Sequence, residues 1–172
     1  MIIKNTIKTE VSTDDDTRYY LKIEWNKDLP CATVIMLTAG VTDGICFDKS
    51  TSLCLSNLIS LGYGSCYVVK LFSNSEITTA DDEENLKAIK YALSKSDAVI
   101  YAAGTGKDCN KKVVHRKMQI MKLLKEADSK IYCIADNDGK MFYHPLCPKV
   151  HTWILSEFDV NKICEDEKNG QK

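Results

Sequence analysis

Polar side chains and glycines that can bind anions or transfer protons are concentrated in three segments of the chain, residues 38–48, 104–109 and 136–146. Each segment follows a short apolar run, and a fourth such run is followed by Ser73 and Asn74. If the four runs are neighbouring parallel strands, these segments meet at the carboxyl edge of one sheet, where open α/β sheets bind their ligands. We therefore expect one candidate site along this edge.

His144 is the best candidate for acid–base chemistry, because an imidazole titrates near neutral pH and can donate to a developing anion. It lies beside Pro145, whose ring restricts the local backbone. A structural histidine bonded to a nearby carbonyl explains the residue equally well. Asp43 and Asp48, at the first segment, can position a water or a metal, although turn formation and helix capping also account for them.

A second motif is Gly104-Thr105-Gly106-Lys107, which stands before a predicted helix. Glycines let backbone N–H groups approach an anion, so the motif resembles a phosphate cradle. It lacks the spacing of a P-loop and of a dinucleotide-binding fingerprint. A strand-to-helix turn that requires small residues is the simpler interpretation.

The elements that must position these residues follow from hydrophobic periodicity. Four apolar runs predict buried strands, at residues 33–38, 66–72, 98–103 and 130–135. Amphipathic segments predict helices between them, at about residues 48–61, 81–96 and 109–127, and a last short helix at 150–158. Asp48 or Ser50 is expected to cap the first helix, and Gly62 to end it.

The amino-terminal region has a different pattern. Residues 1–16 end in a polar, acidic stretch that indicates a loop, and residues 18–25 alternate in a way that indicates an antiparallel edge strand. We therefore predict a three-layer α/β/α sandwich with a mainly parallel four-stranded central sheet plus this edge strand. Residues 1–160 form the single domain, and residues 161–172 form a polar tail.

Composition limits the classes of function. The 172 residues carry a net charge of −1, which argues against a dedicated duplex-DNA binder with a basic face. One helix face, with Lys112, His115, Arg116 and Lys122, is the only polyanion patch predicted, and a solvated face explains it most simply. No apolar run reaches the roughly 20 residues of a membrane helix, and no signal peptide is evident, so we expect a cytoplasmic protein without membrane contact.

The eight cysteines contain no C-x-x-C pair and several lie in apolar runs, which predicts reduced, partly buried thiols. A zinc site at Cys133, His144 and Cys147 is the alternative, but its spacing fits no closed zinc site. We expect neither a metal nor a cofactor.

The order of short motifs resembles the domain of unknown function 1643 family of bacteria and phages, over about residues 18–146. The motifs that carry this resemblance are R-Y-Y-L at 18–21, M-L-T-A-G at 36–40, D-K-S at 48–50, G-Y-G at 62–64, V-V-K-L-F at 68–72, Asn85, A-G at 103–104 and H-P-L at 144–146. The family has no characterised activity, so this resemblance implies the fold alone.

The layout is also similar to that of uracil-DNA glycosylases. That resemblance implies that Thr38 lies in a water-handling loop, that Lys70 occupies the place of a base-reading asparagine, and that His144 stabilises a departing base anion. The sequence departs from that pattern, because Thr38-Ala39-Gly40 replaces Asn-Pro-Ser, Lys70 replaces Asn and Ala103 replaces Trp. A lysine has only donors and cannot read both a donor and an acceptor on a base edge.

We therefore expect a domain that binds a nucleobase, a nucleotide or single-stranded nucleic acid, with residual or altered N-glycosidic hydrolysis. His144 and Asp43 are the catalytic candidates. The ligand-binding candidates are Thr38, Ala39, Gly40, Asp48, Lys70, Asn74, Asn85, Gly104 and Pro145. The alternatives are a non-enzymatic protein-interaction module that forms a homodimer, and a phosphate-handling enzyme that uses residues 104–107.

Overall fold

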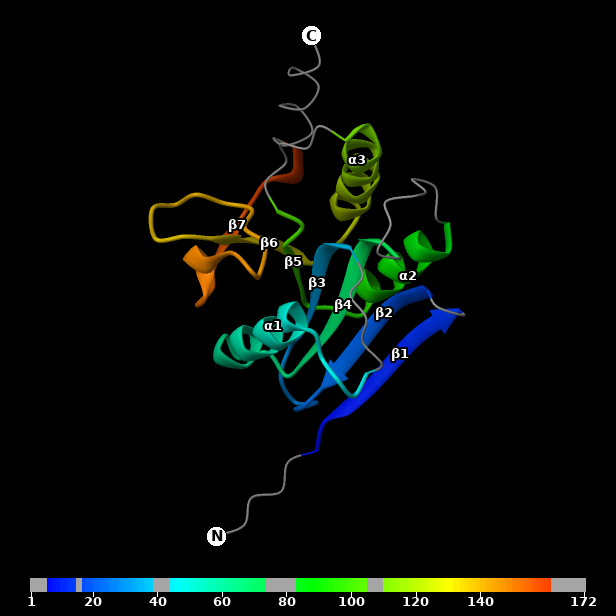
Figure 1. The fold of residues 1–172 in the computed structure, drawn as a ribbon, viewed down its shortest axis with the longest axis vertical. Coiled ribbons are helices and arrows are strands. Elements are labelled where there is room, and N and C mark those ends of the chain that lie inside the picture. Colours follow the sequence, from blue (N-terminus) through cyan, green and yellow to red (C-terminus); the bar gives the residue numbers. More distant parts are fainter. Residues whose placement is uncertain (1–5, 15–16, 39–43, 74–82, 105–109, 162–172) are drawn as a thin grey trace.

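A seven-stranded mixed sheet organises the protein (Figure 1). The computed structural model describes residues 6–14, 17–38, 44–73, 83–104 and 110–161. The strands are β1 (Lys8–Asp14), β2 (Thr17–Glu24), β3 (Cys31–Thr38), β4 (Ser65–Phe72), β5 (Ala98–Tyr101), β6 (Lys130–Ala135) and β7 (Ile154–Glu157). The helices are α1 (Lys49–Ser60), α2 (Glu83–Ser94) and α3 (Lys111–Lys125), and Pro148–Val150 form a 3₁₀ turn.

The strand order is β1-β2-β4-β3-β5-β6-β7, and the four central strands β4, β3, β5 and β6 are parallel. The prediction of an α/β protein with a parallel sheet core is confirmed. Every residue of β4 is buried, as is typical of a parallel strand covered on both faces. The carboxyl ends of the four strands consequently lie along one edge of the sheet.

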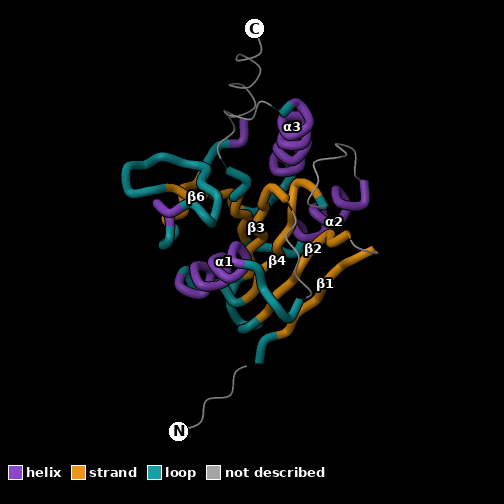
Figure 2. The backbone as a smooth tube through the Cα atoms, in the orientation of Figure 1, coloured by secondary structure: helices purple, strands orange, loops and turns teal. Residues whose placement is uncertain are grey.

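Helices cover both faces of this sheet, which gives three layers (Figure 2). Alternate residues of β4 show the division, since Cys66 and Val68 pack in a core with Cys54 and Leu58 of α1. The intervening residues of β4 pack in a second core with residues of α2 and α3, such as Ile120 of α3. Both cores are apolar, so burial on the two faces stabilises the sheet.

The number and place of the antiparallel strands differ from the prediction. β1 lies within the region predicted as a loop, and it pairs with β2, so the segment at residues 18–25 is antiparallel but is not the edge strand. Most β1 residues are exposed, whichever face of the sheet their side chains point to. The segment therefore lacks the alternation of apolar and polar residues that marks a half-buried strand. The predicted helix at 150–158 is instead the end of the 3₁₀ turn followed by β7, which pairs with β6. There, the buried Val150 and Trp153 imitate a helical spacing.

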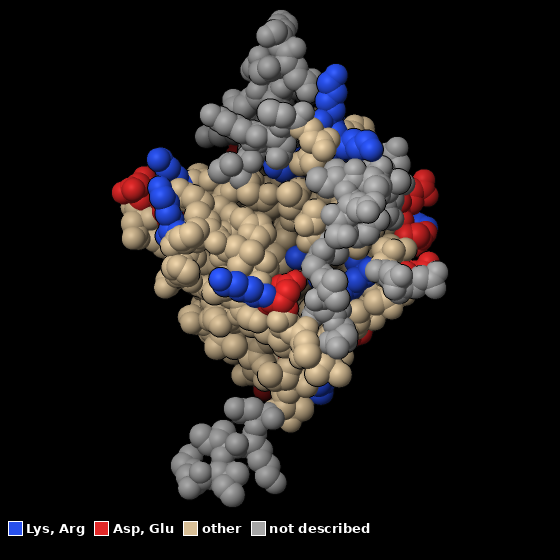
Figure 3. All heavy atoms as spheres, viewed as in Figure 1, with Lys and Arg blue, Asp and Glu red and all other residues tan. Residues whose placement is uncertain are grey.

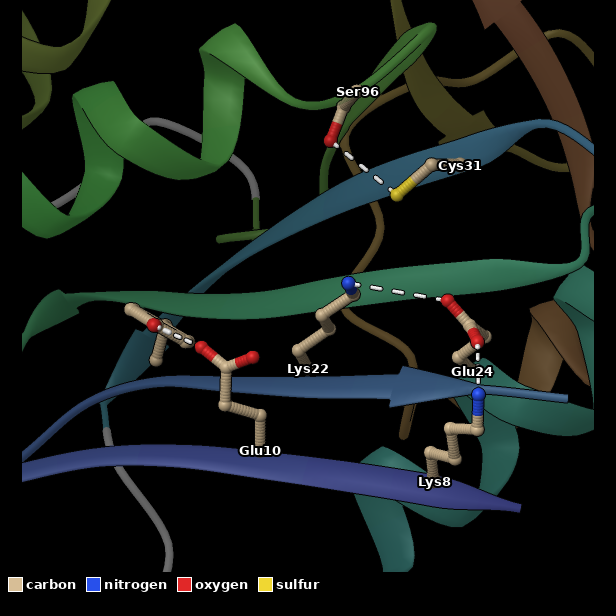
Figure 4. A network of polar contacts seen from close by, with 7 residues as sticks. Lys8, Glu10, Lys22, Glu24, Cys31 and Ser96 are labelled. Carbon is tan, nitrogen blue, oxygen red and sulfur yellow. Dashed lines mark hydrogen bonds and ion pairs between the residues drawn. The ribbon is translucent and has the colours of Figure 1, made fainter. Parts of the chain in front are cut away.

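Polar contacts join β1 to β2 and the start of β3 to the turn before β5 (Figure 4). Glu24 of β2 lies between two lysines, 3.5 Å from Lys8 Nζ and 3.9 Å from Lys22 Nζ. The Sγ of Cys31 lies 3.8 Å from the Ser96 hydroxyl. Exposed ion pairs of this kind contribute up to about 1 kcal/mol each, so the register of β1 depends mainly on its backbone pairing.

Helix α1 begins and ends as the sequence predicts. Asp48 is its N-cap, and the carboxylate accepts a hydrogen bond of 2.7 Å from the Thr51 N–H. At the other end Gly62 has φ +85°, and the N–H of Tyr63 donates to the Leu58 carbonyl at 3.0 Å. This arrangement is a Schellman motif, which requires the left-handed conformation that glycine adopts without strain.

Gly64 is required for a different reason, because the backbone of another turn lies against it. A methyl group at this position would overlap the carbonyl oxygen of Asn26 and lie 2.6 Å from the Leu29 Cβ. We expect Gly64→Ala to lower the free energy of unfolding by about 3 kcal/mol, measured by urea denaturation. Gly62→Ala is the matched control and should lose only about 1 kcal/mol, because its strain is in φ and the space beside it is open. Equal losses in the two variants would contradict this account.

No disulfide joins the described cysteines, and they range from buried, as in Cys66, to exposed, as in Cys46. Burial raises the pKa of the Cys54 thiol to about 12, so it stays protonated at neutral pH. Among the described residues, no helix has the length and apolarity needed to cross a bilayer.

Candidate functional site

Four ionisable side chains from distant parts of the chain meet on the α1 face of the sheet, near the carboxyl ends of its parallel strands. They are Arg18 of β2, Asp48 at the start of α1, Lys70 of β4 and His144 in the loop after β6. Asp48 acts electrostatically on the other three, Arg18 acts on Lys70, and Lys70 acts on His144. We call these four residues the charged cluster.

Lys70 places an amine in the interior. Its side chain is 3% exposed, and its Nζ lies 3.7 Å from the Sδ of Met36. A thioether is a weak acceptor, so this contact leaves the ammonium poorly satisfied. Burial lowers the pKa of Lys70 to about 8, with Asp48 opposing that effect and Arg18 adding to it. The amine is therefore close to its titration point at neutral pH.

Arg18 is the second buried cation of the charged cluster. Its side chain is 6% exposed, and both terminal nitrogens, Nη1 and Nη2, are buried without a hydrogen-bond partner in the described part of the chain. Burial lowers the pKa of Arg18, but an arginine keeps its charge in proteins. Buried polar groups in native proteins are nearly always hydrogen-bonded, so this guanidinium calls for acceptors from outside the described chain.

An irregularity in β2 explains how Arg18 reaches this face. Leu21 and Ile23 pack in the core on the α1 side, and strict alternation along the strand would turn Arg18 to the opposite side. The register against β1 shifts by one residue here, since Ser12 is opposite Tyr20 but Thr13 is opposite Arg18. Tyr19 is thus the extra residue of a β-bulge, and bulges commonly redirect a side chain beside a functional site.

Asp48 compensates part of this positive charge. It is half-buried, and burial raises its pKa. The hydrogen bond from Thr51 and the charges of Lys70 and Arg18 lower the pKa more, so that the carboxyl group stays ionised. The charged cluster therefore holds two buried cations against one carboxylate.

His144 completes the charged cluster from the fourth parallel strand. Its Nδ1 accepts a hydrogen bond of 3.2 Å from the Leu146 N–H, which places the proton of the neutral ring on Nε2. Burial lowers the pKa of His144, and the charge of Lys70 lowers it further while Asp48 opposes both. At neutral pH the residue is thus an uncharged imidazole with one N–H donor.

The other predicted site residues have separate positions. Thr38 ends β3 and is half-buried opposite Phe72, and Gly104 follows β5 with φ +89°. Pro145 is buried beside His144. Four predicted residues, Ala39, Gly40, Asp43 and Asn74, lie outside the described residues, as do residues 105–109 of the glycine motif.

Asn85 supports β4 rather than facing the charged cluster. Its Nδ2 donates to the carbonyls of Lys70 and Leu71, at 3.1 Å each, from the first turn of α2. These bonds fix the end of the strand that carries Lys70. Asn85 is accordingly a positioning residue for the site.

The predicted basic helix face is wrong in one member. Lys112, His115 and Lys122 are exposed on α3, but Arg116 is fully buried. Its Nε donates to the Leu71 carbonyl at 2.7 Å, because the long side chain reaches over the end of β4. No group of three or more metal-ligating side chains occurs in the described ranges, and the candidates Cys133, His144 and Cys147 do not form one.

Comparison with known families gives a match over most of the chain. The family described as "Protein of unknown function (DUF1643)" matches residues 18–146. This range begins at Arg18 and ends just beyond His144, so it contains the whole charged cluster. No curated protein matches the chain.

Proposed function

Because the chain belongs to the DUF1643 family of proteins of unknown function, its own residues are the guide to its activity, and we propose that the charged cluster binds a phosphate group. The ligand is a nucleotide or the end of a single-stranded nucleic acid. Arg18, Lys70 and His144 provide the donors, and Asp48 keeps the two cations in place.

The observation that carries this proposal is the buried guanidinium of Arg18, whose Nη1 and Nη2 have no partner among the described residues. Burying such donors without acceptors costs about 1–3 kcal/mol for each group, and more when the group is charged. An oxyanion with two oxygens in one plane satisfies both nitrogens at once. A bound anion therefore satisfies donors that the described residues leave without acceptors.

The charges of the neighbouring residues favour phosphate among the anions. Lys70 adds a second positive charge, and the two cations exceed the single carboxylate of Asp48. His144 adds a neutral N–H donor that does not repel cations. A phosphate group offers three oxygens to these three donors, whereas a carboxylate offers two.

The wider surface favours a small ligand over a duplex. Figure 3 shows the face that carries α1, on which the charged side chains outside the grey region occur in small, separate groups on a mostly uncharged surface. Duplex binding requires a continuous basic surface that contacts several phosphates. The net charge of −1 points the same way.

The similarity in layout to uracil-DNA glycosylases adds a nucleobase to this proposal. In that layout the histidine after the fourth parallel strand faces the base, and the Nε2–H of His144 is suited to donate to a base oxygen. Lys70 in place of an asparagine does not read a base edge, so recognition through phosphate is the stronger part of the proposal.

The test is calorimetric titration with inorganic phosphate, nucleoside monophosphates, the matching nucleosides and a short single-stranded oligonucleotide. We expect the phosphate-bearing ligands to bind and the nucleosides to bind much more weakly. Arg18→Met should reduce affinity about thirtyfold, which corresponds to the loss of one charge-assisted contact. Lys122→Met, on the exposed face of α3, is the control and should bind as the parent protein does. Absence of binding by every phosphate-bearing ligand would refute the proposal.

A further inference from the structure

Lys70 has surroundings that phosphate binding alone does not require. Its amine is buried beside the thioether of Met36, and the thiol of Cys54 also lies close enough to interact with it. Asp48 and His144 are only half-buried, so these two members of the charged cluster have surface exposed to solvent. An amine in an apolar surrounding, next to a second cation, is a usual setting of a nucleophilic lysine.

We propose that Lys70 Nζ forms an imine with an aldehyde on a ligand whose phosphate group is held by Arg18. This inference rests on the proposed function, since Arg18 supplies the anchor that brings the carbonyl carbon to the amine. The ligand class is a phosphate-bearing aldehyde, such as the open-chain form of a sugar phosphate or the abasic end of a nucleic acid.

Two properties of the charged cluster support the reaction. With a pKa of about 8, about one Lys70 amine in ten is neutral at pH 7, against fewer than about one in a thousand for a lysine of pKa 10.5. The carboxylate of Asp48 lies close enough to Lys70 to stabilise the positive charge of the protonated imine. Arg18 cannot replace the lysine as a nucleophile, because its guanidinium stays protonated.

The step balances without an oxidant or a reductant. The lone pair of neutral Nζ attacks the carbonyl carbon, the C–N bond forms, and the carbonyl electron pair moves to oxygen. The Nε2–H of His144 donates a hydrogen bond to that oxygen, and a solvent water carries one proton from the positively charged nitrogen to the oxygen, which gives a carbinolamine. The hydroxyl group then takes up a proton and leaves as water, and the nitrogen lone pair forms the C=N bond of the protonated imine. Hydrolysis by the reverse steps releases the ligand.

The experiment is reductive trapping with sodium cyanoborohydride, followed by intact-mass measurement and peptide mapping. The probes are glyceraldehyde 3-phosphate, glyceraldehyde without phosphate, and a single-stranded oligonucleotide with one abasic site. We expect Lys70 to be labelled at least about tenfold faster than the buried Lys117 or the exposed Lys122. Comparison of the sugar phosphate with the oligonucleotide distinguishes the two sources of the aldehyde.

Variants separate the nucleophile from the anchor. Lys70→Met and Lys70→Arg should show no label at position 70. Arg18→Met should slow the labelling of Lys70 by glyceraldehyde 3-phosphate to the rate seen with glyceraldehyde. Lys117→Met, a change at another buried lysine, should leave the Lys70 label unchanged. Thermal unfolding of each variant verifies that it is folded, and if either Lys70 variant is unfolded the comparison rests on the other.

The outcomes also separate this inference from the proposed function. If phosphate binds through Arg18 but Lys70 is labelled no faster than Lys117, the imine is refuted and phosphate binding stands. If Lys70 is labelled equally fast with and without phosphate on the aldehyde, the anchoring by Arg18 is refuted. If neither binding nor selective labelling occurs, the proposed function fails together with this inference.

Discussion

Replacing Asp48 by asparagine is expected to lower the free energy of unfolding by about 2 kcal/mol at pH 7, because the carboxylate attracts two buried cations and solvent screens part of this attraction. The carboxylate of Asp48 is the anionic member of the charged cluster, and it stabilises the buried charges of Arg18 and Lys70. Asparagine retains a side-chain oxygen that can accept the hydrogen bond from the Thr51 N–H. The variant therefore removes the charge and keeps the helix cap.

Urea denaturation of two further variants makes this measurement specific. Asp48→Ala removes both charge and cap, and should cost about 1 kcal/mol more than Asp48→Asn. Asn110→Ala removes the uncharged cap of α3, whose side chain accepts from the Lys112 N–H at 3.0 Å, and should cost about 1 kcal/mol alone. If Asp48→Asn is within about 0.5 kcal/mol of the parent protein, the buried cations do not depend on this carboxylate.

Replacing Lys70 by methionine should have the opposite effect, a gain of about 3 kcal/mol at pH 7. A lysine whose pKa falls from 10.5 in the unfolded chain to about 8 in the folded chain lowers the free energy of unfolding by about this amount at pH 7. Methionine has a similar length, and its surroundings include Met36 and Cys54, so it should pack without the cost of a buried charge. The same variant should lose affinity for phosphate.

The difference in stability between the Lys70→Met variant and the parent protein should depend on pH. Between about pH 8 and about pH 10.5 the unfolded chain binds the Lys70 proton more fully than the folded chain. The contribution of Lys70 to the stability of the parent protein therefore rises with pH across this range, and the methionine variant lacks that contribution. The advantage of the variant should be full below about pH 8 and gone above about pH 10.5. Denaturation of both proteins at several pH values measures the difference, and a constant difference would show that charge burial is not its cause.

Much of the candidate site follows from the sequence because parallel strands have their carboxyl ends at one edge. Asp48 and His144 were predicted on this basis, Lys70 was predicted from the similarity in layout to uracil-DNA glycosylases, and the structure brings these three together. Asn85 was predicted as a ligand residue, but its contacts with the β4 backbone depend on how α2 packs, which no local pattern reveals.

The residues that were not predicted have features that hydrophobic patterns do not record. Arg18 stands out in the sequence only as part of a family motif, because an arginine in an alternating strand is expected to face solvent. The bulge at Tyr19 that redirects it has no signature in this sequence. Strand β1 was missed for a related reason, since it is held by backbone pairing with β2 and carries mostly polar, exposed side chains.

The extra residue in β2 affects how relatives of this protein should be compared. A relative that lacks one residue between the positions of Thr17 and Leu21 can retain an arginine in the alignment and still direct it to the other side of the sheet. Segment length, and not residue identity alone, therefore decides whether two members of the family share this guanidinium. An alignment that permits gaps in this strand would conceal the distinction.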